Sequence, residues 1–414
     1  MMMVARSVKA TFLVLLAASL LLFKLSSVER HGSASQRYDR VQPLYSTFNG
    51  LEHQLQRAVE DGHIFHRNQG YPVNKISLAA HPPTLSPIIT ESKEKQPCTH
   101  PKRIVFLKTH KTASSTTASI LQRFGFSRNW TFAVGKGHVI ARSNLIRPSD
   151  IYEYPGMGGK TFDILTNHAR YNRETLEMFL PGATYVTILR KPEDQLESAF
   201  SYFGMYRGMQ LKSSKNPLKS FMEDPYYYYK EKHYFNKERS RNGQLYDLGF
   251  DHRDDENETR INMKIDQLDK EFDLVMITEY FDESLILLKK QLCLDYDDIV
   301  YISKGVRREN MRFEKNEDIV KKMKRWNHGD YLLYQHFNET FWKKIKDYGP
   351  SFEDDKNRFR RLNEKVLSEC VDRNSKIKFY LKNNTEKCET LRRSDADFTK
   401  LIKKSMAARF GKHV

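Results

Sequence analysis

The residues best suited to chemistry lie in one short segment, Lys108–Thr116 (KTHKTASST). Its two lysines and its hydroxyl groups can bind a phosphate or sulfate, and the histidine between the lysines can exchange a proton near neutral pH. A surface loop that only caps a helix needs one hydroxyl group, and this segment has five. The sequence therefore predicts an anion-binding loop, whose candidate ligands are Lys108, Thr109, Lys111, Thr112, Ala113, Ser114, Ser115 and Thr116.

Other candidate site residues lie in three later segments. In chain order they are His168, Arg190, Ser198, Lys304, Arg307 and Arg308. A planar guanidinium group such as that of Arg190 suits a phosphate dianion, which it can bind with two parallel hydrogen bonds. Three alternatives stay open: a surface salt bridge for the arginine, a solvated charge run for the late basic segment, and a structural role for either histidine.

Alternating strands and helices would have to position these residues. Residues 103–107 form a short apolar run typical of a strand, a polar loop follows, and residues 117–124 have helical spacing. The apolar run 185–189 is followed by Arg190 and then by Pro192, which suits the first turn of a helix. Ligands of open α/β sheets bind beyond the carboxyl ends of the strands, so we expect the loop and Arg190 to face one crevice.

Later segments continue the same alternation. Residues 272–278 are a buried-strand candidate, residues 283–291 form an amphipathic helix, and a basic loop from Ile302 is expected near another strand end. The pattern predicts an α/β fold, with a central, mostly parallel sheet flanked by helices. The phosphate-binding loop is not a Walker A motif, because no glycine occurs between Arg103 and Gly125.

The segment KTHKTASST after an IVFL strand resembles the 5′-phosphosulfate loop of the galactose-3-O-sulfotransferases, a Golgi family. The resemblance covers roughly residues 102–345 and continues through four more segments: Thr166–Tyr171, Val186–Phe203, Glu279–Lys289 and Trp326–Trp342. Several motifs in this order are far more specific than one. The resemblance implies a P-loop-like sulfotransferase fold and the sulfuryl donor 3′-phosphoadenosine 5′-phosphosulfate (PAPS), with no metal expected.

The resemblance also implies roles for individual residues. Residues of sulfotransferases that match Arg190 and Ser198 bind the 3′-phosphate of PAPS, and a late basic loop closes over the nucleotide. Lys191 departs from the family pattern, in which many relatives have aspartate. The implied acceptor is the 3-hydroxyl of a terminal β-galactose. It belongs either to a glycolipid such as galactosylceramide or lactosylceramide, or to a glycoprotein glycan.

Sulfuryl transfer to a hydroxyl group needs stabilisation of the leaving phosphate and removal of the acceptor proton. Lys108 and Lys111 are expected to stabilise the phosphate. His110 is the preferred base because it lies inside the loop, and His168 is the alternative, either as base or as a contact of the acceptor sugar. The four tyrosines of residues 226–229 are expected either to stack on sugar or to pack beside a neighbouring element.

The N-terminus indicates a membrane anchor. Arg6 and Lys9 precede an apolar stretch that begins at Ala10 and partly resumes after Lys24. We interpret this stretch as a type II signal anchor rather than a cleaved signal peptide, since no convincing cleavage site follows it. The predicted regions are a cytosolic N-terminus (1–9), a transmembrane anchor (10–28), a stem (29–101), a catalytic domain (102–350) and a basic helical C-terminal extension (351–414), with the catalytic domain in the Golgi lumen.

Glycosylation signals and cysteines agree with a lumenal location. Four Asn-x-Thr sequons begin at Asn129, Asn257, Asn338 and Asn383. The four cysteines, Cys98, Cys293, Cys370 and Cys388, allow two disulfides with three possible connectivities. A buried free thiol is the alternative for Cys293, which lies in an apolar run.

The composition excludes several classes of protein. The 414 residues include 69 Lys and Arg against 52 Asp and Glu, a net charge of +17, which favours anionic partners without identifying them. The 12% aromatic content argues against a disordered chain, and the anchor and sequons argue against nucleic-acid binding. A lumenal P-loop sugar kinase and a non-enzymatic binder of anionic glycans remain the competing functions. Nothing in the sequence indicates an oligomeric state.

The C-terminal extension carries part of the positive charge. From residue 351 onward it has 17 Lys and Arg against 10 Asp and Glu. We expect charged helices that lie on the catalytic domain and approach anionic lipid headgroups.

Overall fold

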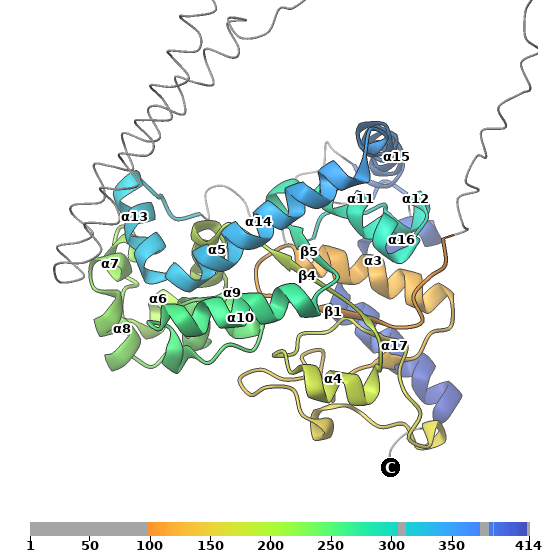
Figure 1. Cartoon of the computed structure of the whole chain (residues 1–414), viewed down its shortest axis with the longest axis horizontal. Helices are drawn as coiled ribbons and strands as arrows, with labels where there is room; N and C mark the ends of the chain where they lie inside the picture. Colours follow the sequence, from red (N-terminus) through yellow and green to blue (C-terminus); the bar gives the residue numbers. More distant parts are fainter. Residues whose placement is uncertain (1–97, 305–311, 373–380, 384, 412–414) are drawn as a thin grey trace, which may run out of the picture. The chain divides into compact units, whose positions relative to one another are not determined.

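A parallel β-sheet forms the centre of the fold. The computed structural model describes residues 98–304, 312–372, 381–383 and 385–411. Within these residues all neighbouring strands are parallel, in the order β2 (Phe132–Ala133), β3 (Ile164–Leu165), β1 (Ile104–Leu107), β4 (Thr184–Leu189) and β5 (Leu274–Ile277). The prediction of an α/β fold with a parallel sheet flanked by helices is confirmed (Figure 1).

The three strands predicted from apolar runs are present, and each is covered on both faces. Strands β1 and β5 are buried at every residue, and β4 is buried from Tyr185 onward. Phe106 pairs with Val186, and Val186 with Leu274, so the three strands run in register through the core. Parallel sheets covered by helices have such continuous apolar strands. All three strands therefore end at the same edge of the sheet.

Helices surround the sheet. Figure 1 shows α10 and α14 side by side, and α11 and α14 both pack against β5. The described helices are α3 (Ser114–Ser127), α4 (Arg173–Phe179), α5 (Pro192–Tyr202), α6 (Met205–Gly208), α7 (Pro217–Glu223), α8 (Pro225–Glu231), α9 (Gly243–Asp247), α10 (Glu258–Glu271), α11 (Phe281–Leu292), α12 (Tyr296–Ile299), α13 (Glu317–Trp326), α14 (His328–Tyr348), α15 (Phe352–Cys370), α16 (Glu386–Arg392) and α17 (Asp395–Phe410).

Two boundaries differ from the expectations. Helix α3 begins at Ser114, so its first turn includes Ser115 and Thr116, which were expected in the loop. Serine and threonine favour loops and caps by intrinsic propensity, and packing overrides that preference here. The expectation of a strand that ends near Ile302 is wrong, because residues 301–304 are irregular. Ile302 is apolar because it packs in a small cluster with residues of the C-terminal helices.

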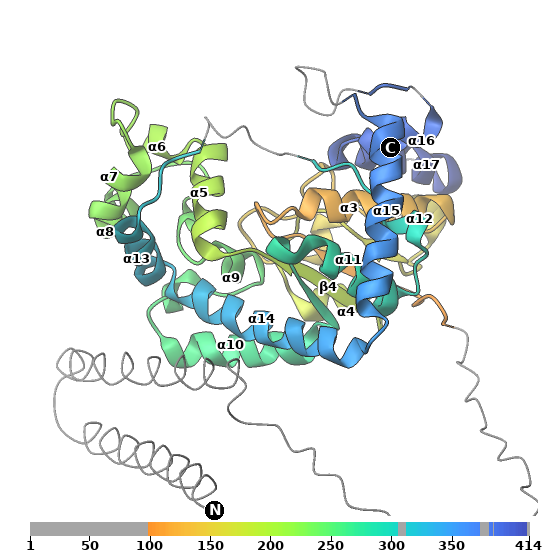
Figure 2. The same cartoon turned by 90° about the horizontal axis from the view of Figure 1, so that it is seen from above.

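The C-terminal extension forms helices, as predicted, and these helices are part of the core. Phe398, Ile402 and Met406 recur every fourth residue on α17 and are buried in the main hydrophobic cluster. Helix α17 packs against α3, the helix that follows the predicted anion-binding loop. Figure 2 shows α15, α16 and α17 gathered on the side of the molecule that carries α3 and α12. The extension is thus placed where it can contribute to a site at the start of α3.

Two disulfides use all four cysteines. Cys98 pairs with Cys293, and Cys370 pairs with Cys388, which selects one of the three connectivities and leaves no free thiol at Cys293. Within the described ranges no helix is both long and apolar enough to cross a membrane. The expected anchor, residues 10–28, lies outside those ranges, as does nearly all of the expected stem.

Candidate active site

The loop after β1 is held in an unusual backbone conformation. Lys111 and Ala113 have φ angles of 65° and 60°, in the left-handed region that residues with a Cβ atom rarely adopt. Thr109 secures the loop, because its hydroxyl donates to the carbonyl of Ile188 on β4 and lies 2.8 Å from the hydroxyl of Thr112. Such strained residues persist only where the surrounding structure fixes them, and they cluster at functional sites.

A cavity of about 420 Å³ opens at the ends of the strands and contains most of the predicted site. The predicted residues that line it are His110, Lys111, Thr112, Ala113, Ser114, Ser115, His168, Arg190, Ser198 and Lys304. Lys108, Thr109 and Thr116 are buried and lie outside the lining. Arg307 and Arg308 lie outside the described residues. The structure therefore brings four segments that are distant in the sequence together, and the loop and Arg190 face one crevice as the strands predict.

Lys108 does not face this cavity. Only 2% of its side chain is exposed, and its ammonium group contacts the carboxylate of Asp395 and lies 3.3 Å from the hydroxyl of Ser115. Burial lowers the pKa of Lys108, although Asp395 acts to raise it. Burial acts to raise the pKa of Asp395, but the charge and the hydrogen bond of Lys108, with smaller contributions, together outweigh this effect and hold that pKa below its ordinary value. The charge of Lys108 is thus balanced within the protein.

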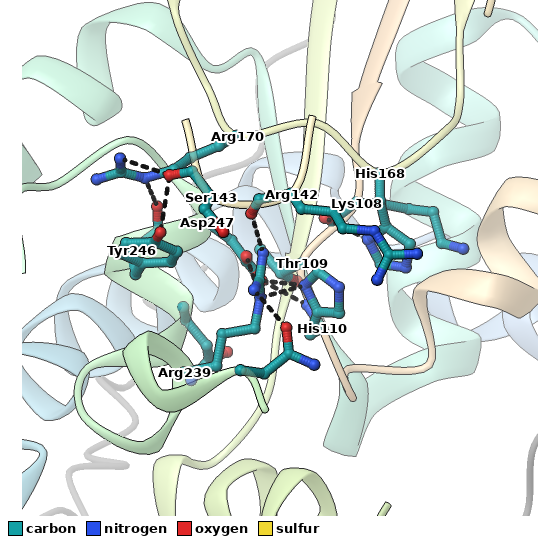
Figure 3. A network of polar contacts seen from close by, with 12 residues as sticks. Lys108, Thr109, His110, Arg142, Ser143, His168, Arg170, Arg239, Tyr246 and Asp247 are labelled. Atoms are coloured by element: carbon teal, nitrogen blue, oxygen red, sulfur yellow. Dashed lines mark hydrogen bonds and ion pairs between the residues drawn. The ribbon is translucent and has the colours of Figure 1, made fainter. Parts of the chain in front are cut away.

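His110 is bound by a buried carboxylate. Asp247 accepts a hydrogen bond from the backbone N–H of His110 (2.8 Å), and the same oxygen lies 2.7 Å from Nδ1 of the ring. Arg239 donates to the other oxygen of Asp247 at 3.0 Å (Figure 3). Nε of Arg239 also lies 3.0 Å from Nδ1 of His110. Because a carboxylate can only accept, we assign the proton to Nδ1, shared with Asp247, and the lone pair to Nε2. Burial lowers the pKa of His110 below its ordinary value, although Asp247 acts to raise it, and the ring is neutral near pH 7.

His168 lies directly against His110. The two rings are stacked, with centroids 4.0 Å apart and planes 14° apart. Nδ1 of His168 donates to the carbonyl of Lys108 at 3.1 Å, which leaves Nε2 of this ring as the acceptor. Burial, reinforced by the neighbouring charges of His110 and Lys108, lowers the pKa of His168 well below its ordinary value. The site therefore contains two neutral imidazoles, and each could accept a proton.

Arg190 lies at the carboxyl end of β4, as predicted. Its backbone N–H donates to the side chain of Gln244 at 2.8 Å, and its guanidinium group donates to the carbonyl of Lys111 at 3.2 Å. Ser198 follows on α5, so both predicted phosphate ligands line the same cavity. Thr278, after β5, donates to the carbonyls of Thr112 and Leu189 and thereby fastens the loop to the sheet.

Lys304 links the cavity to the C-terminal helices. Its ammonium group donates to the carbonyls of Leu391 (2.8 Å) and Arg393, and its backbone N–H donates to the hydroxyl of Thr116. Burial, followed by the charge of Arg123, lowers the pKa of Lys304 to about 7. This lysine therefore holds the segment before α17 in place, in addition to lining the cavity.

Sequence reasoning missed the partners of the predicted residues. Asp247 and Arg239 support His110, Asp395 supports Lys108, and none of the three lies in a motif that pointed to the site. Their separations along the chain from the residues they contact are 137, 129 and 287 residues. A buried acid has no local signature, so only the packing reveals these residues. Within the described part of the chain, no group of three or more His, Cys, Asp or Glu side chains could hold a metal ion.

The four tyrosines of residues 226–229, which were expected either to stack on sugar or to pack beside a neighbouring element, lie outside the cavity lining. Tyr226 and Tyr229 pack against Trp326, with ring centroids 5.0 and 5.6 Å from it. Of the four sequon asparagines, Asn129, Asn257 and Asn383 are exposed and Asn338 is half-buried on α14.

Comparisons with known proteins show the family that the sequence motifs resemble. The family model described as galactose-3-O-sulfotransferase matches residues 63–394. The galactosylceramide sulfotransferase of Mus musculus is 36% identical over 283 residues, which are 66% of this chain and 65% of the mouse protein. The human galactosylceramide sulfotransferase is 34% identical over 308 residues, 72% of this chain and 71% of that protein. Galactose-3-O-sulfotransferase 2 of Sus scrofa is 34% identical over 274 residues, 64% of this chain and 67% of the pig protein.

Proposed function

The chain belongs to the galactose-3-O-sulfotransferase family, and we propose that it transfers the sulfuryl group of PAPS to the 3-hydroxyl of a terminal β-galactose. The observation that carries this proposal is the imidazole of His110 at the wall of a cationic cavity, with its Nδ1 2.7 Å from the carboxylate of Asp247. A neutral, oriented imidazole beside an anion site is what proton removal from a sugar hydroxyl requires.

The lining of the cavity suits a nucleotide with several phosphate or sulfate groups. Lys111, Arg190 and Arg312 contribute positive charge, and Asp395, the one carboxylate in the described lining, is paired with Lys108. The first N–H groups of a helix have no partner within the helix, and here they belong to residues at the start of α3 that line the cavity. Arg190 and Ser198 are proposed to hold the 3′-phosphate, and the loop to hold the phosphosulfate.

The donor supplies an activated sulfuryl group. His110 would accept the proton of the acceptor hydroxyl at Nε2, and the ionised carboxylate of Asp247 would stabilise the resulting imidazolium ion. Burial acts to raise the pKa of Asp247, but its interactions with His110, including two hydrogen bonds, and the charge of Arg239 together outweigh it, so the pKa of Asp247 lies below the ordinary value. Lys111 would stabilise the negative charge that develops on the leaving phosphate. His168 is the alternative base.

The decisive experiment is a transfer assay with purified protein and PAPS labelled with ³⁵S. We expect label on galactosylceramide, lactosylceramide or a galactose-terminated oligosaccharide, and the preferred acceptor will distinguish glycolipid from glycoprotein specificity. A labelled galactose residue that resists periodate should assign the sulfate to the 3-hydroxyl, because sulfation at this position alone leaves no vicinal diol for periodate to cleave. No transfer to any galactoside, together with transfer of the γ-phosphate of ATP, would overturn the proposal.

We further propose that residues 10–28 anchor the chain in the Golgi membrane as a single-pass type II protein with the active site in the lumen. The two disulfides and the three exposed sequon asparagines support this topology. In sealed Golgi vesicles, we expect the catalytic domain to resist protease and to carry glycans that an N-glycosidase removes. Cleavage of this domain in intact vesicles would contradict the topology.

A further inference from the structure

Three aromatic side chains lie together beside the proposed base. The ring of Phe203 lies 5.8 Å from that of His110, 5.2 Å from Tyr202 and 6.0 Å from Phe235, between centroids. Tyr202 is 68% exposed and Phe235 is 58% exposed. We call these three residues the aromatic shelf. A single exposed apolar ring needs no explanation, whereas rings grouped at the edge of a site indicate a surface that binds a ligand.

Two different segments position the aromatic shelf relative to His110: helix α5 carries Tyr202, and the segment before Arg239 carries Phe235. Tyr202 lies four residues after Ser198 on α5, and residues at this spacing share one face of a helix, so Tyr202 also lines the cavity. On the other side, Phe235 directly precedes Asn236, whose side-chain oxygen accepts a hydrogen bond of 2.9 Å from Arg239. Arg239 also holds the carboxylate that orients the base. Phe235 is therefore tethered to the same arginine as the base.

The members of the shelf differ in what they already contact. The ammonium group of Lys111 lies 3.7 Å from the centroid of the Tyr202 ring, a cation–π contact. That face of Tyr202 serves the lysine of the anion-binding loop. Among the described residues, neither Phe203 nor Phe235 has such a close cation–π contact, and the guanidinium of Arg142 lies 6.0 Å from the Phe235 ring. Phe203 therefore presents an apolar ring beside His110, and Phe235 extends this apolar surface outward. Both lie next to the residues that line the cavity rather than among them.

A galactose ring matches such a surface. One face of the pyranose ring presents C–H groups, and its edge presents hydroxyl groups, so it needs an apolar aromatic wall with a few polar groups beside it. The exposed Arg142 could bind hydroxyl groups, because its backbone carbonyl is fixed by a 2.7 Å hydrogen bond from Arg239. Figure 3 shows Arg142 and Arg239 close to the two histidines.

We propose that Phe203 and Phe235 form the acceptor subsite, against which the C–H face of the terminal galactose packs so that its 3-hydroxyl reaches His110. Tyr202 instead positions Lys111. The proposal rests on the proposed function, because it assigns an acceptor to that reaction. It separates two effects within one aromatic cluster: loss of Phe235 weakens acceptor binding, and loss of Tyr202 impairs the step that Lys111 assists.

The test compares variants of the exposed Phe235, whose removal leaves the core intact. In Phe235→Ala we expect the KM for a β-galactoside to rise about tenfold, with kcat nearly unchanged, since uniform binding energy is lost. Phe235→Trp should restore the wild-type KM, and Phe235→Leu, which is apolar but lacks a ring face, should behave like alanine. In Tyr202→Ala, kcat should fall. Tyr227→Ala removes a ring of similar exposure (44%) away from the cavity and is the matched control.

A direct measurement of galactoside binding shows whether the proposed subsite is wrong or only the proposed reaction is wrong. Methyl β-galactoside is titrated into the full chain loaded with adenosine 3′,5′-bisphosphate, and saturation-transfer NMR reports its contact. Binding that is lost in Phe235→Ala, with bisphosphate affinity unchanged by calorimetry, supports the subsite even if the reaction proves to be different. An unchanged KM and unchanged galactoside binding in Phe235→Ala would overturn it, as would a wild-type chain that binds no galactoside.

Discussion

Lys108, at the end of the first strand, pairs with Asp395, the first residue of helix α17 and 287 residues further along the chain. The pair joins the start of the anion-binding loop to the C-terminal extension. Asp395 lies one residue beyond the match to the family, which ends at residue 394. The C-terminal helices therefore complete the wall of the site, and the loop does not stand alone.

Removing this carboxylate should destabilise the protein. Asp395→Asn leaves the buried ammonium group of Lys108 without its countercharge, and we expect the free energy of unfolding to fall by about 3 kcal/mol. Urea denaturation measures this change. Asp397→Asn, an exposed acid in the same helical turn, is the control and should have little effect. In the double variant with Lys108→Met, part of the lost stability should return, and equal losses in single and double variants would argue against the pairing.

The choice between the two histidines can be tested by substitution. We expect His110→Ala to lower kcat about a thousandfold, because general-base catalysis is lost, and to retain binding of adenosine 3′,5′-bisphosphate. His328→Ala, on an exposed histidine paired with Glu258, should leave the rate unchanged. Steady-state kinetics with the labelled donor provide the measurement. A near-normal rate in His110→Ala, with a large loss in His168→Ala, would assign the base to His168.

The pH dependence of the rate should report the state of His110. Its pKa lies below the ordinary value, and the base must be neutral, so activity should rise with pH through that lowered pKa and then level off. In Asp247→Asn the carboxylate that raises this pKa is gone. The acid limb should therefore move to lower pH while the plateau rate falls, since the ring loses its fixed tautomer. A shift of the limb to higher pH would contradict this assignment.

Arg190 should control donor affinity rather than the rate of the chemical step. We expect Arg190→Ala to weaken binding of adenosine 3′,5′-bisphosphate about thirtyfold, as for the loss of a charge-assisted hydrogen bond. Arg190→Lys should recover only part of this affinity, because lysine lacks the planar fork. The neighbouring exposed Lys191, changed to alanine, is the control. Calorimetric affinities that are equal in wild type and Arg190→Ala would exclude this role.

Much of the frame of the site follows from local sequence. The apolar runs that became β1, β4 and β5 predicted parallel strands, and the residues after them share one edge of the sheet because parallel strands end on the same side. The strand ends therefore predict that Lys111 and Arg190 face one crevice, the family resemblance adds Ser198, and all three line the cavity. The errors were local too: α3 starts earlier than its spacing suggested, and Ile302 is apolar through packing rather than because it lies in a strand.

The sequence by itself determined the position of the predicted anion-binding loop, its histidine and the edge of the sheet where they lie, because strand and helix periodicity act over a few residues. Only the tertiary structure decided which charges remain available to a ligand. Asp395 neutralises Lys108, Asp247 selects the tautomer of His110, and Phe203 and Phe235 meet beside it. These contacts depend on how distant segments pack, and burial sets the state of each ionisable group, so no spacing along the chain encodes them.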